Sequence, residues 1–156
     1  MPLPDFDAIA VGDVLPPLVL GPVTRHALGL YADASGDDNP LHIDPDYARR
    51  EAGMPDAFAH GMLSAAWLAR VLTRWVDPTA IRQLNVRFVA ITHIGDEVHC
   101  RATVADKRLD RGTPCVYLEL RVHNQANIPR LAGTAVVALP APRPTASLPS
   151  THKDMT

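Results

Sequence analysis

Acidic, imidazole and turn-forming side chains are concentrated in one short segment, Ser35 to Asp44. Within it, Asp37 and His42 are separated by Asn39-Pro40. Proline fixes its own φ and disfavours the helical region for the residue before it, so a bent loop is predicted here. A bent loop can direct a carboxylate and an imidazole at one point, where together they can hold a water molecule and move its protons. We therefore treat Asp37 and His42 as candidate acid–base groups.

Two other interpretations of this segment stay open from the residues alone. Asp, Asn, Gly and Pro are ordinary turn formers, so the loop can be purely structural. A metal site is the second alternative, in which His42 and Asp44 are joined by Asp37 or Asp38, with His60 as the nearest further ligand. The segment does not match a calcium-binding EF-hand loop, because a leucine and a histidine stand where an oxygen ligand and a glycine are required.

Helical patterns flank the loop on both sides. Val23 to Gly36 opens with a threonine N-cap, closes with glycine and places its apolar residues on one helical face. Asp44-Pro45 combines an N-cap with a proline at the first helical position, which predicts a short helix to about Glu51. Apolar residues surround most of the segment Gly61 to Val76, so this long helix is expected in the core.

Beyond residue 80 the pattern becomes extended, with alternating or β-branched apolar residues that predict strands. The predicted strands are Ile81 to Ile91, Glu97 to Lys107, Cys115 to Asn124 and Arg130 to Leu139, with a short strand Leu18 to Leu20 earlier in the chain. We expect an antiparallel meander with one face covered. The nearly all-apolar helix then has one place to lie, which is the concave face of this sheet. The predicted fold class is α+β, a curved antiparallel sheet wrapped around a long central helix.

Composition limits the function classes. The 156 residues are 47% hydrophobic and 21% charged with a net charge of -2, which supports a packed core and excludes a strongly basic nucleic-acid binder. No apolar run reaches the roughly 18–20 residues that cross a bilayer, and no export signal is recognised, so we expect a cytoplasmic protein with Cys100 and Cys115 reduced. Residues 141–156 are rich in proline and are predicted to be a flexible tail, which leaves 1–140 as one domain.

Two motifs carry a resemblance to a known family. Tyr31 to Asp44, with the sequence YADASGDDNPLHID, resembles the hydratase-2 motif of the MaoC-like, R-specific enoyl-thioester hydratases and dehydratases. Ala59 to Leu63, with the sequence AHGML, is similar to the second block of that family, and the likeness extends from about Val19 to Leu139. The resemblance implies a hot-dog fold for the domain 1–140. It also implies hydration of trans-2-enoyl thioesters, or the reverse dehydration of (R)-3-hydroxyacyl thioesters, without metal or cofactor.

The resemblance further implies partners. The acyl group would be carried on coenzyme A or acyl carrier protein, and neither nucleic acid nor a membrane is expected as a partner. Hot-dog domains usually pair through their sheet edges, so we expect a homodimer with the site near the interface. A heteromer with a second hot-dog chain is the alternative.

The resemblance assigns roles to single residues. Asp37 and His42 would hold the catalytic water, and the backbone N–H of Gly61 would bind the thioester carbonyl at the positive end of the following helix. Loop-shaping roles are implied for two further residues, Asn39 and His60. One position departs from the family, whose helix serine is replaced here by Ala69. Ser64 lies about one and a half helical turns from that position, so we assign it no catalytic role.

Two rival functions are compatible with the same fold. A thioesterase on the same fold would place a carboxylate on the central helix, but Gly61 to Val76 contains neither Asp nor Glu. A non-catalytic subunit of a heteromeric dehydratase, which only binds the acyl chain, would be expected to lack the acid–imidazole pair. This chain has both members of that pair, and a catalytic subunit of a heteromer remains open.

Overall fold

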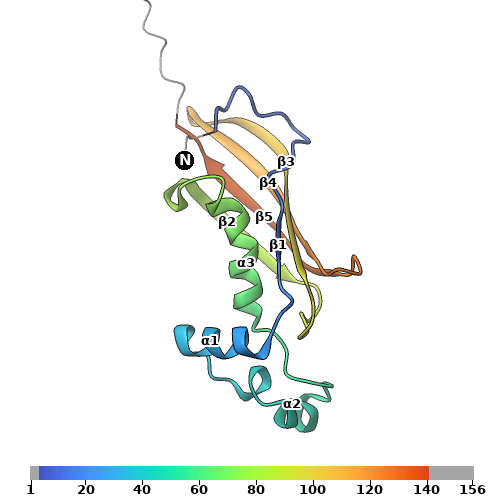
Figure 1. Ribbon diagram of the computed structural model, residues 1–156. Coiled ribbons are helices and arrows are strands. Elements are labelled where there is room, and N and C mark those ends of the chain that lie inside the picture. The colour runs from blue at the N-terminus through green and yellow to red at the C-terminus, as the bar shows by residue number, and fades with distance from the viewer. Residues whose placement is uncertain (1–3, 141–156) are drawn as a thin grey trace, which may run out of the picture.

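The fold is described from a computed structural model of residues 4–140 (Figure 1). The elements follow the order β1 (Leu18–Leu20), α1 (Arg25–Ser35), η1 (Pro40–His42), α2 (Pro45–Ala52), α3 (Gly61–Thr73), η2 (Pro78–Ala80), β2 (Ile81–Phe88), β3 (Val98–Asp110), β4 (Thr113–His123) and β5 (Pro129–Ala138). The strands form one antiparallel sheet, against which α3 lies, while α1 and α2 sit beyond one end of it (Figure 1). The predicted α+β fold class is confirmed. The predicted tail, 141–156, lies outside the described residues.

The strand order corrects the predicted meander. It is β1-β3-β4-β5-β2, so β2 pairs with β5 at the far edge instead of with its sequence neighbour β3. The connection between β2 and β3, residues 89–97, is too long for a tight hairpin. It runs from the β2 edge of the sheet past β5 and β4 to β3. At its start, the N–H groups of Val89 and Ala90 both donate to the carbonyl of Arg130, at 2.8 and 3.1 Å. Alternating residues reveal the faces of a strand but not its neighbours, which is why the prediction was wrong here.

Helix caps define the limits of the loop between α1 and α2. The Thr24 hydroxyl accepts the N–H of Ala27 at 3.1 Å, and Gly36 ends α1 in the left-handed conformation with φ of 72°. The Asp44 carboxylate accepts two N–H groups in the first turn of α2. The three predicted caps are confirmed, whereas α3 ends at Thr73, three residues before its predicted end. Residues 37–43 are therefore held between two capped helices.

The core lies between α3 and the sheet. Leu68 and Leu72 of α3 are fully buried, and each such side chain contributes about 1.5–3 kcal/mol through burial. Strand β4 adds four buried residues at a spacing of two: Val116, Leu118, Leu120 and Val122. Trp67 and Trp75 are partly buried and pack against this core. No helix within residues 4–140 has both the length and the apolar character needed to span a bilayer.

Both cysteines are buried as free thiols. Burial raises the pKa of the Cys100 thiol to about 12, against a smaller opposing effect of Arg70. Cys100 therefore stays protonated at neutral pH and is a poor nucleophile.

Candidate active site

The loop between α1 and α2 is shaped by its own polar groups. The side-chain oxygen of Asn39 accepts the N–H of Leu41 at 3.1 Å and so begins the short helix η1. The N–H of Asn39 faces the Asp37 carboxylate at 3.4 Å, and the N–H of His42 donates to the Asn39 carbonyl at 3.0 Å. Asn39 thus links the two ends of the turn that separates Asp37 from His42. The bent loop predicted from Asn39-Pro40 is present.

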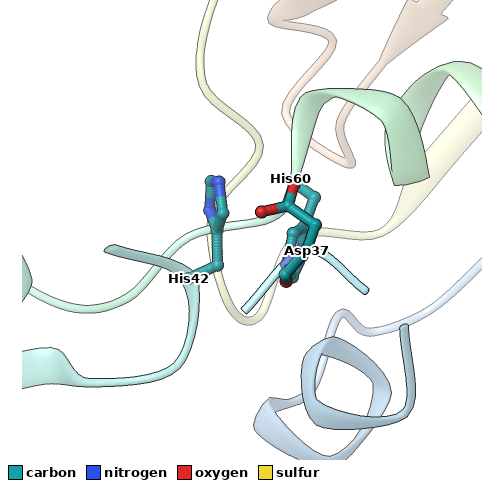
Figure 2. Close-up of side chains that lie close together, drawn as sticks. All are labelled: Asp37, His42 and His60. Atoms are coloured by element: carbon teal, nitrogen blue, oxygen red, sulfur yellow. The ribbon is translucent and has the colours of Figure 1, made fainter. Parts of the chain in front are cut away.

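The fold brings Asp37 and His42 together and adds His60 to them (Figure 2). One side-chain donor atom of each residue lies within 4.8 Å of those of the other two. In Figure 2 the carboxylate of Asp37 points toward the imidazole of His42. Asp37 is exposed, His42 is half-buried and His60 is fully buried. The cluster is therefore reached by solvent from one side and closed on the other.

The hydrogen bond of His42 determines its tautomer. Nδ1 lies 2.8 Å from the carbonyl oxygen of Phe58, and a carbonyl can only accept, so Nδ1 carries the proton and Nε2 is left as an acceptor. Burial lowers the pKa of His42 below its ordinary value of 6.5, and His60 lowers it further, against opposing effects of the Phe58 carbonyl and the Asp37 carboxylate. His42 is therefore mainly neutral at pH 7. Because Nε2 and the Asp37 carboxylate both accept, one water can donate its two O–H groups to them.

His60 lies behind this pair and contacts both members. Its Nε2 is 3.0 Å from the main-chain carbonyl oxygen of Asp37, to which it donates. Its ring centroid is 4.1 Å from that of His42 and 4.8 Å from that of Tyr31. Its Nδ1 is buried and has no hydrogen-bond partner within residues 4–140. His60 thereby links the main chain of Asp37 to the ring of His42, a contact across 23 positions that sequence spacing did not reveal.

A cavity of about 300 Å³ opens beside His42. Its walls are mainly apolar and include Phe58, Phe88 and Leu131. Gly61 also lines it, and as the first residue of α3 its N–H has no partner within the helix. A Cβ at Gly61 would lie 3.2 Å from the Phe88 ring, so the glycine avoids a tight contact inside the cavity. The volume is at the lower end of the roughly 300–1,000 Å³ typical of small-molecule sites.

The remaining candidates lie in different places. Asp44, considered above as a metal ligand, caps α2 instead, and Asp38 is exposed to solvent. Ala69 is not among the residues that line the cavity. Ser64 and Thr92 do line it, although the sequence analysis gave no role to Ser64 and did not identify Thr92. Hydroxyl residues are common in helices and loops, so only the fold could distinguish these two.

A buried ion pair anchors the connection 89–97, four of whose residues line the cavity. The Asp96 carboxylate lies 2.9 Å from the guanidinium of Arg130 and accepts from the side chain of Asn124 at 3.0 Å and the N–H of His93 at 2.9 Å. These contacts attach the connection 89–97 to the start of β5 and to the turn before it. Asp96 lies between two predicted strands, and no local pattern identifies its partners, because they are distant along the chain.

The fold and the site define a class. A long helix against an antiparallel sheet is the hot-dog arrangement, and here a carboxylate and a neutral imidazole lie near the N-terminal end of that helix. The model of the MaoC-like domain family matches residues 18–126, and the chain belongs to that family.

Relatives of known function and structure agree with this family. The chain is 42% identical over 84 residues to an (R)-specific enoyl-CoA hydratase of Rhodospirillum rubrum, a match that covers 53% of this chain and 58% of that protein. It is 32% identical over 112 residues to an (R)-specific enoyl-CoA hydratase of Aeromonas caviae, covering 70% and 81%. The solved structure of the (R)-hydratase from A. caviae involved in PHA biosynthesis superposes with a TM-score of 0.74 and 28% identity, over 85% of this chain and 98% of that one. The chain spans little more than half the length of the Rhodospirillum protein.

Proposed function

We propose that this protein catalyses the R-specific addition of water to trans-2-enoyl thioesters, or the reverse dehydration of (R)-3-hydroxyacyl thioesters. The observation that most supports the proposal is the neutral His42, which has Nε2 unprotonated, lies beside the Asp37 carboxylate and lines a mainly apolar cavity. Two hydrogen-bond acceptors next to one cavity can hold a water molecule by both of its O–H groups, which suits a hydration reaction. The names of the relatives support hydro-lyase chemistry of the same kind.

The mechanism assigns one task to each group. The Asp37 carboxylate and His42 Nε2 each accept a hydrogen bond from the water. One of them takes a single proton while the water oxygen, which keeps its other proton, forms a bond to C3 of the enoyl group. The electrons of the C2–C3 double bond move toward the thioester carbonyl, whose oxygen gains negative charge. The N–H of Gly61 and the positive end of the α3 dipole stabilise that charge. The proton taken from water is then delivered to C2, so that one water molecule supplies both the hydrogen and the hydroxyl of the product.

Asn39 and His60 act in this proposal as positioning residues. Asn39 shapes the turn between the two reacting side chains through its bond to the Leu41 N–H. His60 holds the main chain of Asp37 and packs against His42. Neither residue is required to exchange a proton with the substrate.

The thioesterase and metal alternatives receive less support from the site. A thioesterase carboxylate would lie on α3, which has neither Asp nor Glu between Gly61 and Thr73. Metal binding would use Asp37 with the ring nitrogens of His42 and His60 that do not face carbonyl oxygens, and among the described residues this set has three members, one fewer than a structural zinc site uses. The proposed reaction needs neither a metal nor a redox cofactor.

The partners belong to the same proposal. The substrate would be carried on coenzyme A or acyl carrier protein in the cytoplasm. Strand β2 is a sheet edge, and apolar residues along it and just after it are exposed, including Leu84, Phe88 and Val89. Such an edge favours pairing with a second strand. We therefore propose a homodimer through β2, with a second hot-dog chain as the alternative partner.

Light scattering of the purified chain tests this assembly. We expect twice the mass of one chain, and Leu84→Lys should shift the protein toward the monomer. Leu109→Lys, at an exposed position near the β3–β4 turn, is the matched control. A monomeric wild-type protein, or co-purification with another hot-dog chain, would contradict the homodimer.

The enzymatic proposal is tested by incubating the purified protein with trans-2-enoyl thioesters of coenzyme A and of acyl carrier protein. Loss of the conjugated thioester absorbance reports hydration, and chiral chromatography of the product reports its configuration. Asp37→Asn should lower kcat by about 100- to 10,000-fold, because general acid–base groups typically contribute that much. Asp38→Asn, which changes an exposed neighbour by the same chemistry, should leave kcat nearly unchanged. Full activity in Asp37→Asn, or formation of the S product, would refute the proposal.

A further inference from the structure

Two buried hydroxyl groups stand out in the otherwise mainly apolar cavity wall. Ser64 and Thr92 both line the cavity, and their exposed fractions are only 2% and 4%. They come from different elements, α3 and the connection between β2 and β3. The mechanism described above gives no task to either hydroxyl.

Their hydrogen bonds are incomplete. Ser64 Oγ lies 3.4 Å from the His60 carbonyl and 3.4 Å from Thr92 Oγ1. An O–H···O bond is normally 2.5–3.0 Å long, so both contacts are weak. Within residues 4–140, the Thr92 hydroxyl has no partner other than Ser64. Buried polar groups are normally well hydrogen-bonded, so both hydroxyls have capacity for another partner that enters the cavity.

The backbone holds both hydroxyls in place. Ser64 is on the first turn of α3, three residues after Gly61, and the helical rise places it about 4.5 Å further along the axis. The Thr92 carbonyl accepts the N–H of Ala59 at 2.9 Å, which attaches Thr92 to the segment before α3. A ligand whose carbonyl meets the Gly61 N–H can therefore reach both hydroxyls with a group a few carbon atoms further along its chain.

We propose that Ser64 and Thr92 form a polar subsite that binds a keto or hydroxyl oxygen on the acyl chain, a few carbon atoms beyond the thioester carbonyl. This inference rests on the proposed function, since it takes the cavity to hold the acyl group of a thioester. The substrates would be enoyl thioesters with an oxygen substituent on the chain, in preference to plain hydrocarbon chains. A site built to hydrogen-bond a substrate oxygen discriminates against an analogue that lacks it, because its own polar groups are then left unpaired.

Binding of saturated thioesters tests the subsite without turnover, because these ligands have no double bond to hydrate. Calorimetry would compare 4-oxopentanoyl-CoA with pentanoyl-CoA, and 5-oxohexanoyl-CoA with hexanoyl-CoA, on the full chain. We expect at least one oxo ligand to bind roughly two- to tenfold more tightly for each hydrogen bond that it gains. Ser64→Ala and Thr92→Val remove the hydroxyls with little change in volume, and the double variant should abolish the preference. The readout is the ratio between the paired ligands, so a general loss of affinity cancels.

The outcomes separate this inference from the proposed function. Equal binding of the paired ligands by the wild-type protein, or a preference that persists in the double variant, would overturn the subsite. Hydration of 2-pentenoyl-CoA, measured on the same wild-type sample, decides the proposed function independently. Failure of every thioester to bind would overturn both. Melting curves would establish that each variant is folded, and the two single variants preserve the test where the double variant is unstable.

Discussion

The two sides of the cavity are built in different ways. One side is formed by His42 at the end of a loop, residues 37–43, whose groups are largely exposed and are joined by short-range bonds, such as that from the Leu41 N–H to Asn39. The opposite side consists of α3 and the sheet, where Leu68 and Val116 are fully buried. The first side presents reactive side chains, and the second presents a backbone N–H at Gly61 and a shaped surface.

The groups proposed to react therefore lie on the exposed loop, and the surface that shapes the cavity lies on the packed elements. A carboxylate that must exchange protons with water benefits from exposure, because full burial would favour its neutral form. A helix that must present one N–H at a fixed point benefits from packing, which opposes local motion. Substitutions on the loop should therefore change the rate with little effect on stability, and substitutions in the packed side should do the reverse.

The largest expected effect concerns the loop. His42→Gln should lower kcat by about 100- to 10,000-fold, because it removes the imidazole base. The double variant Asp37→Asn/His42→Gln should be about as impaired as either single variant, since residues that act as a unit are strongly non-additive. Steady-state kinetics and urea unfolding of all three proteins would provide the measurement. Losses that multiply in the double variant would show that the two residues act independently.

The packed side should respond in stability. Leu68→Ala removes a fully buried side chain of α3 and should lower the free energy of unfolding by about 2–5 kcal/mol. Leu30→Ala, at a residue of α1 that is 56% exposed, is the control and should stay within about 0.5 kcal/mol of wild type. Chemical denaturation measures both. A cost for Leu30→Ala as large as that for Leu68→Ala would remove the contrast between the two sides.

A glycine pair tests the junction between α1 and the loop. Gly36 has a φ of 72°, so Gly36→Ala should cost about 1–2 kcal/mol. Gly29 lies inside α1 with open space where a Cβ would be, so Gly29→Ala should stabilise the protein by about 0.5–1 kcal/mol. Thermal melts would show opposite shifts for the two variants. Shifts of the same sign would indicate that backbone conformation is not the controlling factor.

The smallest expected effect concerns His60, which joins the two sides. His42 is needed in its neutral form, so kcat/KM should fall as the pH decreases through its pKa, with a midpoint below 6.5 in the wild-type protein. His60→Ala removes one cause that lowers this pKa, so the midpoint should move upward. Loss of the bond to the Asp37 carbonyl should also lower kcat roughly two- to tenfold. His60→Gln, which retains a donor, should recover part of kcat, and an unchanged pH profile in His60→Ala would argue against this coupling.

Much of the local structure could be predicted because its causes are close in sequence. Thr24, Gly36 and Asp44 act on neighbouring N–H or carbonyl groups, so their caps appear in the sequence as they do in the structure. The bent loop follows from Pro40, which constrains the residue before it. The period of two in β4 follows from the alternation of side chains in any strand.

The order of the strands could not be predicted in the same way. Strand β2 pairs with β5 because the connection 89–97 crosses the sheet and is fastened there by the Asp96–Arg130 ion pair. That pair joins residues far apart in the chain, and neither residue carries a local signal of its partner. Local patterning therefore identified the strands but misplaced β2.

The sequence by itself determined which side chains can react and that a bend lies between Asp37 and His42, because both depend on residue type and on local backbone restriction. Only the tertiary structure decided that His42 keeps Nε2 unprotonated, since that depends on the carbonyl of Phe58. The placement of His60 behind the pair, and of Ser64 beside Thr92, likewise depends on packing between distant segments. Proton positions and pocket polarity arise from contacts across the fold, and such contacts leave no fixed spacing in a sequence.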